Sequence, residues 1–328
     1  MIKKILFVVL LIASVFVYKN YEDNILQLTV QRELVIYSDL DSKFVNLLAD
    51  TFSKSKNINL KAMVLNELNG EKIQADIILT NSYALKSLAR AGSLENMELT
   101  ALNDIETNFK DINNAWTGIF YDPVVLLINQ DFSRKYGQEN LFDWDSLLKF
   151  DNIRIVLENF NNSILQQHLL AAFSSNMGED EIIGYFSKLN SRVVQYSKYP
   201  FTPIRMVVSG DADVAITSRS YIAEYLENDF PAYVIQPKTG TPVTLYGAGI
   251  YKGTDSKEEA LIFVDWLLNS PDVKNIILNL ETGYEFVTVG NGNKLWLNTK
   301  YRPAADRNDL LNRWLNEVRF SNNKEENL

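Results

Sequence analysis

The chain has 328 residues, 46% hydrophobic and 22% charged, a globular composition that excludes general disorder and favours two domains. Its 32 Lys and Arg against 41 Asp and Glu give a net charge of -9, which argues against nucleic acid as a partner. There is no cysteine, which excludes disulfides, thiolate metal sites, thiol nucleophiles and a lipid-acylated cysteine.

The first predicted element is a targeting segment. Lys3 and Lys4 precede the uncharged run 5–18, and polar residues follow it, which is typical of export signals. The run is shorter than the roughly 20 residues that span a bilayer comfortably, yet no cleavage site of small residues follows it. A cleaved signal peptide and a retained membrane anchor therefore both stay open for residues 1–28. Either one predicts a periplasmic or other extracytoplasmic location.

Strand and helix patterns alternate after that segment. ELVIYSDLD predicts a strand that leads into a helix, and ADIILT predicts a second strand before a helix that begins at NSY and stops at Gly92. Further strands are predicted in VVLLIN, RIVL and VAIT, each followed by a helix or a turn. This order predicts an α/β fold with a mainly parallel sheet flanked by helices.

Two later helices have clear end signals. Ser256 and Glu259 form a capping-box pattern at the start of one helix, and Pro271 follows its end. Thr202 followed by Pro203 predicts the N-cap and first-turn proline of another helix, and Gly210 predicts its end. No internal repeat and no low-complexity linker is present, so two domains must be joined by short crossovers. The last residues, 321–328, are predicted to be a polar tail.

Small polar residues recur where the predicted strands end. In open parallel sheets, ligands bind beyond the carboxyl ends of the strands, near helix N-termini. Any one such residue is also an ordinary helix cap, but their recurrence predicts a cleft lined by amide and hydroxyl groups. The residues are Ser38, Asp39, Thr80, Asn81, Ser82, Asn161, Asn162, Ser163 and the run 217–221, which includes Ser220 and Tyr221.

Signatures of catalysis are absent from the sequence. There is no G-x-S-x-G, H-E-x-x-H or phosphate-binding loop motif. The single histidine, His168, has apolar helical neighbours and is interpreted as a packed helix residue rather than a base. Asp211 and Asp213 are interpreted as solvated residues of a turn. We therefore expect no catalytic residue and a protein that is not an enzyme.

Several stretches together resemble one known family, the iron(III)-type extracytoplasmic solute-binding proteins of ABC transporters. They are LVIYSDLDSKFVNLLADTFSK, ADIILTNSYALKSLARAGSLE, AWTGIFYDPVVLLINQ, VVSGDADVAIT and VIQPKTGTPVTLYGAGIYKGTDSKEEALIFVDWLLNSPD. The similarity spans most of residues 33–275, and it depends on the order and spacing of these stretches rather than on one motif.

The resemblance implies the type II periplasmic-binding-protein fold, in which two α/β lobes close over a ligand. It places residues 29–122 and 242–290 in lobe 1 and residues 123–241 and 291–320 in lobe 2. The chain is expected to cross between the lobes near residues 121–129 and 233–241. The implied function is capture of a small anion or chelated iron(III) and its delivery to a membrane permease by a monomeric protein. The alternative is a membrane-tethered sensor that feeds a two-component signalling system.

The ligand-binding residues are also implied by the resemblance. Iron-binding members carry two adjacent tyrosines where this chain has Ser220 and Tyr221, so Tyr221 is a metal ligand only if iron is bound. Relatives without the pair resemble binders of small anions, a role that Ser38, Asn81, Ser82, Asn162 and Ser163 suit. No resident cofactor is expected, since iron(III) would be the transported ligand.

Aromatic residues near the first crossing complete the set of expected binding residues. Trp116, Thr117 and Tyr121 match a segment that approaches the cleft in similar proteins, and Tyr199 is a similar case. Such aromatic side chains cover a ligand when the lobes close, or they pack the junction between the lobes. Both interpretations stay open at this point.

Overall fold

The computed structural model describes residues 33–64, 75–137, 143–225, 230–280, 282–287, 294–298 and 304–321. The predicted targeting segment 1–28 lies outside these residues, and so does the predicted tail after Ser321. Within the described ranges, no helix combines the length and the apolar character that crossing a membrane requires.

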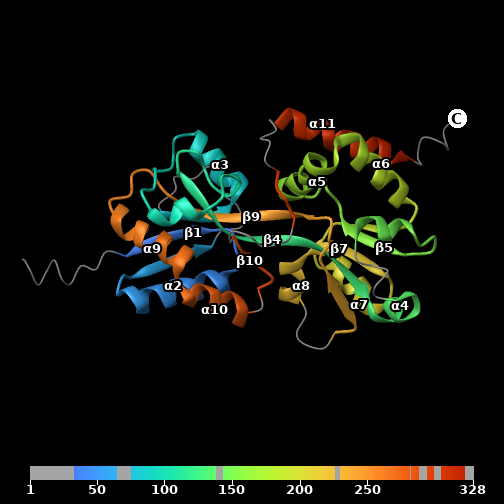
Figure 1. Ribbon diagram of the computed structural model, residues 1–328, viewed down its shortest axis with the longest axis horizontal. Helices are drawn as coiled ribbons and strands as arrows, with labels where there is room; N and C mark the ends of the chain where they lie inside the picture. Colours follow the sequence, from blue (N-terminus) through green and yellow to red (C-terminus); the bar gives the residue numbers. More distant parts are fainter. Residues whose placement is uncertain are drawn as a thin grey trace, which may run out of the picture.

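A mixed sheet runs through the whole molecule (Figure 1). Its order is β2-β1-β3-β9-β4-β7-β5-β6, with the short strands β8 and β10 added to β4 and β11 added to β9. The strands are β1 Leu34–Ser38, β2 Leu60–Val64, β3 Ile77–Asn81, β4 Trp116–Asn129, β5 Ile155–Glu158, β6 Val193–Ser197, β7 Val214–Ser218, β8 Ala232–Ile235, β9 Thr241–Ile250, β10 Glu285–Phe286 and β11 Leu295–Trp296.

The strand directions differ between the ends and the centre of the sheet. Toward both ends the pairs are parallel, since β1 pairs with β2 and β3, and β5 pairs with β6 and β7. In the centre, β4 and β9 run antiparallel to each other, β9 to β3, and β4 to β7. The expected parallel pairing therefore holds at the outer strands, while the two central strands make the sheet mixed.

Strand β4 passes from one half of the molecule to the other, as Figure 1 shows. Its first part, Trp116–Pro123, pairs with β9, and its second part, Val124–Ile128, pairs with β7. Every residue of β4 is buried, so the strand reads in the sequence as a nearly continuous apolar run. We call the half around β1, β2 and β3 lobe 1, and the half around β5, β6 and β7 lobe 2.

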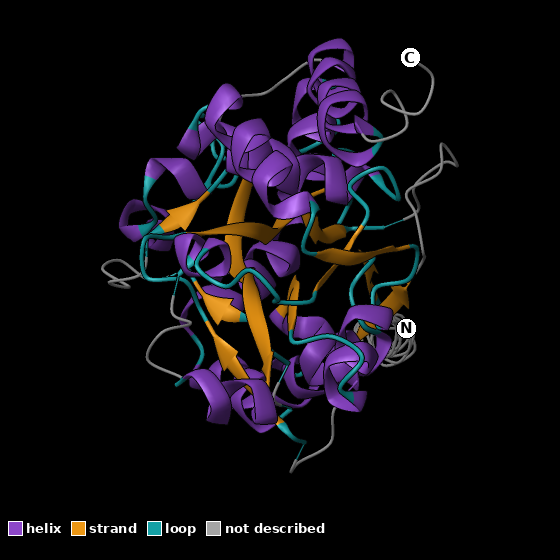
Figure 2. Ribbon diagram, turned by 90° about the vertical axis from the view of Figure 1, so that its right-hand side faces the viewer, coloured by secondary structure: helices purple, strands orange, loops and turns teal. Residues whose placement is uncertain are grey.

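Helices pack against the sheet in both lobes (Figures 1 and 2). Lobe 1 has α2 Ser42–Lys56, α3 Ser82–Arg90, α9 Lys257–Asn269, α10 Pro271–Asn279 and the 3-10 turns Thr100–Asp104 and Thr107–Phe109. Lobe 2 has α4 Gln130–Tyr136, α5 Ile164–Met177, α6 Glu179–Asn190, α7 Thr202–Ser209, α8 Arg219–Tyr225, α11 Ala304–Trp314, the 3-10 turn Trp144–Leu148 and the π-helical turn Leu315–Arg319.

Each lobe has its own hydrophobic core on both faces of the sheet. In lobe 1, Ile36 and Tyr37 are neighbours in β1 and belong to two different buried clusters. In lobe 2, Leu126 and Val125 in β4 do the same. The alternation arises because successive side chains of a strand point to opposite faces. The cores therefore hold each lobe together separately, and β4 and β9 connect them.

Three local predictions differ from the structure in detail. Helix α9 begins directly after Ser256, but the side chain of Ser256 makes no capping hydrogen bond. Helix α7 ends at Gly210 in the left-handed conformation as predicted, although its N-cap is Phe201 rather than Thr202. The interpretation of Asp213 as solvated is wrong. Asp213 is 7% exposed, and its Oδ1 forms an ion pair with Arg154 at 2.7 Å.

Candidate functional site

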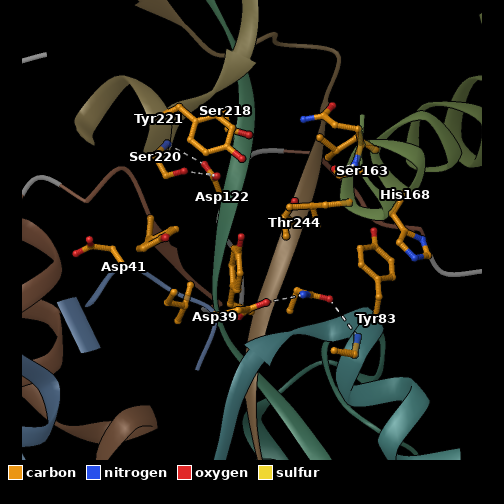
Figure 3. A pocket seen from close by; sticks show the side chains of 18 of the residues that line it. Asp39, Asp41, Tyr83, Asp122, Ser163, His168, Ser218, Ser220, Tyr221 and Thr244 are labelled. Atoms are coloured by element: carbon orange, nitrogen blue, oxygen red, sulfur yellow. Dashed lines mark hydrogen bonds between the residues drawn. The ribbon is translucent and has the colours of Figure 1, made fainter. Parts of the chain in front are cut away.

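A cleft of about 1260 Å³ lies between the two lobes. Its floor is formed by β4 and β9, which contribute Asp122, Thr244 and Tyr246 (Figure 3). Lobe 1 lines it with the start of α2, with α3 and with the segment before β10, and lobe 2 lines it with the starts of α5 and α8. The carboxyl ends of strands from both lobes thus face one space, as expected for open α/β sheets.

Helix caps bring polar side chains to the rim of the cleft. The side chain of Asn81 accepts a hydrogen bond from the backbone N–H of Ala84 at the start of α3. Ser163 does the same for Gln166 at the start of α5, and Asp41 does so for Phe44 at the start of α2. These residues therefore cap helices and line the cleft at once, so the two readings of the sequence are compatible.

Half of the expected binding residues line the cleft. The amide of Asn81 donates to Asp39 Oδ2 at 3.0 Å, and the amide of Asn162 donates to the carbonyl groups of Ser197 and Lys198 at 2.9 Å. These contacts orient both side chains at the rim. The expected residues that line the cleft are Asp39, Asn81, Asn162, Ser163, Ser220 and Tyr221.

Three small expected residues do not line the cleft, because strand and helix geometry turns them inward. Ser38 is fully buried, and its hydroxyl donates to the carbonyl of Leu79 at 2.7 Å. Ser82 is also buried, and so is Thr117, whose hydroxyl lies 3.3 Å from the carbonyl of Gly118. Their hydroxyl groups are directed into the protein, whereas the neighbouring Asp39 and Asn81 face the cleft.

The expected aromatic residues also lie away from the cleft. Trp116 is buried in the second cluster of lobe 1, and Tyr121 is buried with its hydroxyl 2.6 Å from Glu285 Oε2. Both residues therefore pack within the core of lobe 1 rather than in the cleft. Tyr199 is 64% exposed and does not line the cleft either.

A two-point polar contact on the floor joins Asp122 to the start of α8. Asp122 Oδ1 accepts from the backbone N–H of Ser220 at 3.0 Å, and Oδ2 accepts from its hydroxyl at 2.6 Å (Figure 3). Burial raises the pKa of Asp122 to about 6, although the hydrogen bonds from Ser220 and the charge of Arg219 act in the opposite direction. The contact ties the crossing strand to a helix of lobe 2.

An ion pair joins the two lobes beside this contact. Arg219, at the start of α8, pairs with Glu285 in β10, and its second guanidinium nitrogen donates to Gln236 Oε1 at 2.8 Å. Gly283 approaches closely here, because a Cβ atom on it would lie 2.7 Å from the backbone of Arg219. The segment before β10 is therefore held tightly against the start of α8.

Tyrosine side chains form one wall of the cleft. Tyr246 in β9 and Tyr284 before β10 lie 5.6 Å apart between ring centroids, and both contact Phe120. Tyr221 lies across from them on α8, where its ring contacts Phe201. Burial, followed by nearby acidic groups, raises the pKa of all three hydroxyl groups. The chain thus lacks a second tyrosine directly beside Tyr221 in the sequence. Tyr246 of β9 and Tyr284 just before β10 nevertheless line the same cleft.

The opposite wall contains the only histidine of the chain. His168 of α5 stacks on Tyr83 of α3 with ring centroids 3.5 Å apart and planes at 4°. Desolvation, with the charges of Arg307 and Lys86, lowers the pKa of His168 to about 3, so its ring is neutral at neutral pH. His168 is packed, as the sequence indicated, but it is packed at the cleft and against the other lobe.

Among the described residues, no group of three or more His, Cys, Asp or Glu side chains is placed to hold a metal ion. Oxygen donors of two kinds nevertheless line the cleft, carboxylates and phenols. Sequence reasoning missed several of these residues, because their strands and helices carry them without a capping or motif signal. The missed cleft residues are Tyr83, Lys86, Asp122, His168, Glu224, Thr244, Tyr246, Tyr284 and Arg307.

Comparisons with known proteins agree with this geometry. A Haemophilus influenzae protein is 30% identical over 165 residues, which is 46% of this chain and 47%, or about half, of the relative. The Synechocystis protein called iron uptake protein A1 is 25% identical over 270 residues, 74% of this chain and 72% of that protein. The first match covers about half of each chain, and the second covers most of both chains.

A solved structure shares the fold. It is the periplasmic binding protein AfuA from Actinobacillus pleuropneumoniae with exogenous fructose-6-phosphate bound, with a TM-score of 0.66 and 22% identity, covering 88% of this chain and 98% of that one. At that identity the likeness concerns the fold, and it confirms the expected periplasmic-binding-protein class of mixed α/β structure.

The sequence profile of bacterial extracellular solute-binding proteins matches residues 52–285. This match confirms the expectation of a binding protein rather than an enzyme, and neither it nor the relatives support the signalling alternative. Because the profile covers most of the chain and the structure has the corresponding cleft, the protein belongs to the bacterial extracellular solute-binding proteins.

Proposed function

We propose that the protein is the solute-binding component of an ABC importer, which captures a small solute outside the cytoplasm and delivers it to a membrane permease. The observation that carries this proposal is the cleft of about 1260 Å³ lined from both lobes. A solute that contacts both lobes favours the closed form, because it binds that form better than the open one. The closed form is the one that the permease then recognises.

The division into moving lobes supports the same proposal. We place residues 29–122 and 242–290 in lobe 1 and residues 123–241 and 291–320 in lobe 2. Strand β4 changes its partner from β9 to β7 between Pro123 and Val124, and separate cores lie on the two sides of this point. Bending there would change few core contacts, since each core stays within its own lobe.

We infer that the solute is an iron(III) chelate, because both signs of charge line the cleft. Phenol and carboxylate oxygens, the donors that suit a hard trivalent cation, come from Tyr221, Tyr246 and Tyr284 and from nearby acidic residues. Lys86 and Arg307 lie on the other wall, where a negatively charged chelator would find partners. The name of the Synechocystis relative, an iron uptake protein, agrees with this class.

A phosphorylated solute is the second candidate. It is favoured by the start of α5, where Ser163 lines the cleft and unpaired helix N–H groups attract anions. The AfuA structure with fructose-6-phosphate shows that this fold accommodates such a ligand in that protein.

A thermal-shift measurement on the purified protein separates the two candidates, because a ligand that binds only the folded state raises its melting temperature. We expect ferric citrate to raise it in a concentration-dependent manner, and citrate alone or fructose-6-phosphate to raise it less. A rise with fructose-6-phosphate alone would select the second candidate. No rise with any of the three would contradict both ligand classes.

Tyr221→Phe tests the metal-binding side of the cleft. If its phenolate binds iron, the variant loses at least about 1 kcal/mol of binding free energy, and the visible absorption that phenolate-iron(III) bonds produce becomes weaker. The melting temperature without ligand stays nearly the same, since the ring remains. Tyr199→Phe is the matched control, because Tyr199 is 64% exposed and lies outside the cleft. Equal affinity in both variants would remove Tyr221 from the site.

A further inference from the structure

Two rings from different lobes stack at one edge of the cleft. Tyr83 belongs to α3 of lobe 1 and His168 to α5 of lobe 2, and Figure 3 shows their rings facing each other. The centroid distance of 3.5 Å and the interplanar angle of 4° describe a face-to-face contact of the two rings. Such a contact exists only while the lobes stand close together at this edge.

A second contact joins the same two helices through the segment after β11. Asn298 is 5% exposed, and its amide nitrogen lies 3.3 Å from His168 Nδ1. The ammonium group of Lys86, one turn after Tyr83 on α3, donates to the backbone carbonyl of Asn298 at 3.5 Å. Lys86 also lies 5.9 Å from the centroid of the Tyr83 ring. The two contacts support each other, since both depend on the same approach of α3 to lobe 2.

Each helix is otherwise anchored in its own lobe. Leu85 of α3 packs into the second cluster of lobe 1, and Leu169 and Leu170 of α5 pack into the main cluster of lobe 2. The Tyr83 and His168 rings are therefore not needed to hold either helix on its sheet. Their contact contributes mainly to the relative position of the lobes.

We propose that Tyr83, Lys86, His168 and Asn298 form a clasp between the lobes, which holds part of the protein closed before any solute arrives. This inference rests on the proposed capture by lobe closure. The apparent affinity for a solute scales with the fraction of protein in the binding-competent form, so the ring stack of the clasp strengthens capture by raising that fraction. From typical energies of aromatic pairs, loss of the stack lowers the closed-to-open ratio by about three- to tenfold.

The absence of cysteine makes the clasp directly measurable. Asn96→Cys in lobe 1 and Lys188→Cys in lobe 2, both exposed positions, accept spin labels without any competing thiol. Distances between the labels are measured on the full-length protein without solute. Tyr83→Ala and His168→Ala are expected to shift the distribution from short to long distances by the same three- to tenfold change in ratio.

Two controls keep the measurement specific. Tyr83→Phe retains the stacked ring and should retain the short distance, and Tyr199→Ala removes an exposed tyrosine outside the cleft and should change nothing. The double variant of Tyr83→Ala with His168→Ala should open no further than either single variant, because both lose one shared contact. Circular dichroism establishes that each variant is folded, and His168→Leu, which also removes the ring, replaces His168→Ala if the latter does not fold.

Unchanged label distances in the folded Tyr83→Ala variant would overturn the clasp, since that variant removes one ring of the stack. The result is independent of the solute, because no solute is added. Failure of the clasp therefore leaves the proposed import function intact, and failure of every solute to bind leaves the clasp standing.

Discussion

Burial and hydrogen bonding have opposite effects on the charged form of the Asp122 side chain. Asp122 is 4% exposed, and the charged form of a buried carboxylate is disfavoured by desolvation, which raises its pKa to about 6. Its two oxygens nevertheless accept both hydrogen bonds that Ser220 donates. The residue thus stabilises the start of α8 by hydrogen bonding and costs stability by its charge.

The pH dependence of stability follows from this shift. Because the folded protein binds the Asp122 proton more tightly than the unfolded chain, whose group titrates near 3.8, the contribution of Asp122 to the free energy of unfolding falls as the pH rises from about 4 to about 6. The Asp122→Asn variant does not lose this stability as the pH rises, because an asparagine side chain has no proton to release in this range. We expect the difference in melting temperature between Asp122→Asn and the wild type to increase over that interval and then to stay constant. Parallel melting curves across the interval would show that Asp122 titrates normally.

At the scale of elements, the short segment that leads into β10 both lines the cleft and joins the two lobes. It carries Tyr284 into the cleft and Glu285 to the ion pair with Arg219. Gly283 allows this close approach because it adopts a positive φ of 76° and has no Cβ. The segment therefore links the start of α8 in lobe 2 to the tyrosine wall of lobe 1.

Gly283→Ala tests this close approach. The new Cβ atom would lie within 2.8 Å of three backbone atoms of Arg219 and Ser220, so the variant should lose more than about 1 kcal/mol of unfolding free energy. Gly210→Ala is the matched control, because Gly210 has a similar φ of 79° and no heavy atom within 4 Å of the added Cβ. Denaturant unfolding of both variants gives the comparison. An equal loss in the two would mean that backbone strain alone accounts for the effect.

At the scale of the whole molecule, the protein has two cores joined by two long strands and closed by contacts at both edges of the cleft. Asp122, Arg219 and Glu285 join the lobes beside the crossing strands, and the clasp joins them between α3 and α5. The solute therefore enters a cleft whose width depends on contacts between residues of the two lobes that partly line the cleft themselves.

The clasp makes closure dependent on pH. In the closed form the pKa of His168 is lowered to about 3, whereas an exposed histidine in the open form titrates near 6.5. We therefore expect closure to be most favoured above pH 6.5 and to weaken by up to about tenfold per pH unit as the pH falls below that value. The charged groups that face His168 are Lys86 from α3 and Arg307 from α11, and their positive charges oppose its protonation.

Label distances recorded between pH 8 and pH 5 test this dependence. We expect the wild type to open as the pH falls, and His168→Phe to keep one distribution throughout, because it retains a ring and cannot be protonated. Opening of His168→Phe over the same range would assign the effect to another group.

Much of the fold could be predicted because its signals are local. The order of strands and helices follows from periodicity, and Asn81, Ser163 and Asp41 follow strand ends and cap the next helices as single residues do. The rule that ligands bind beyond strand ends also correctly placed four further residues at the cleft: Asp39, Asn162, Ser220 and Tyr221. The expectation that strand-end residues line the cleft is wrong for Ser38 and Ser82, which are buried. Neighbouring side chains of an extended strand point in opposite directions, so the residue next to a cleft residue points into the core.

The sequence by itself determined the family, the α/β order of the elements and the capping residues of the rim, since each depends on residues that are close in the chain. Only the tertiary structure decided which side chains meet in the cleft. Tyr246 joins Tyr221 because β9 returns between the lobes, and Tyr284 joins them because it directly precedes β10, which pairs with β4. His168 meets Tyr83 because two separately anchored helices approach each other. These contacts join residues far apart in the sequence, so no local pattern records them.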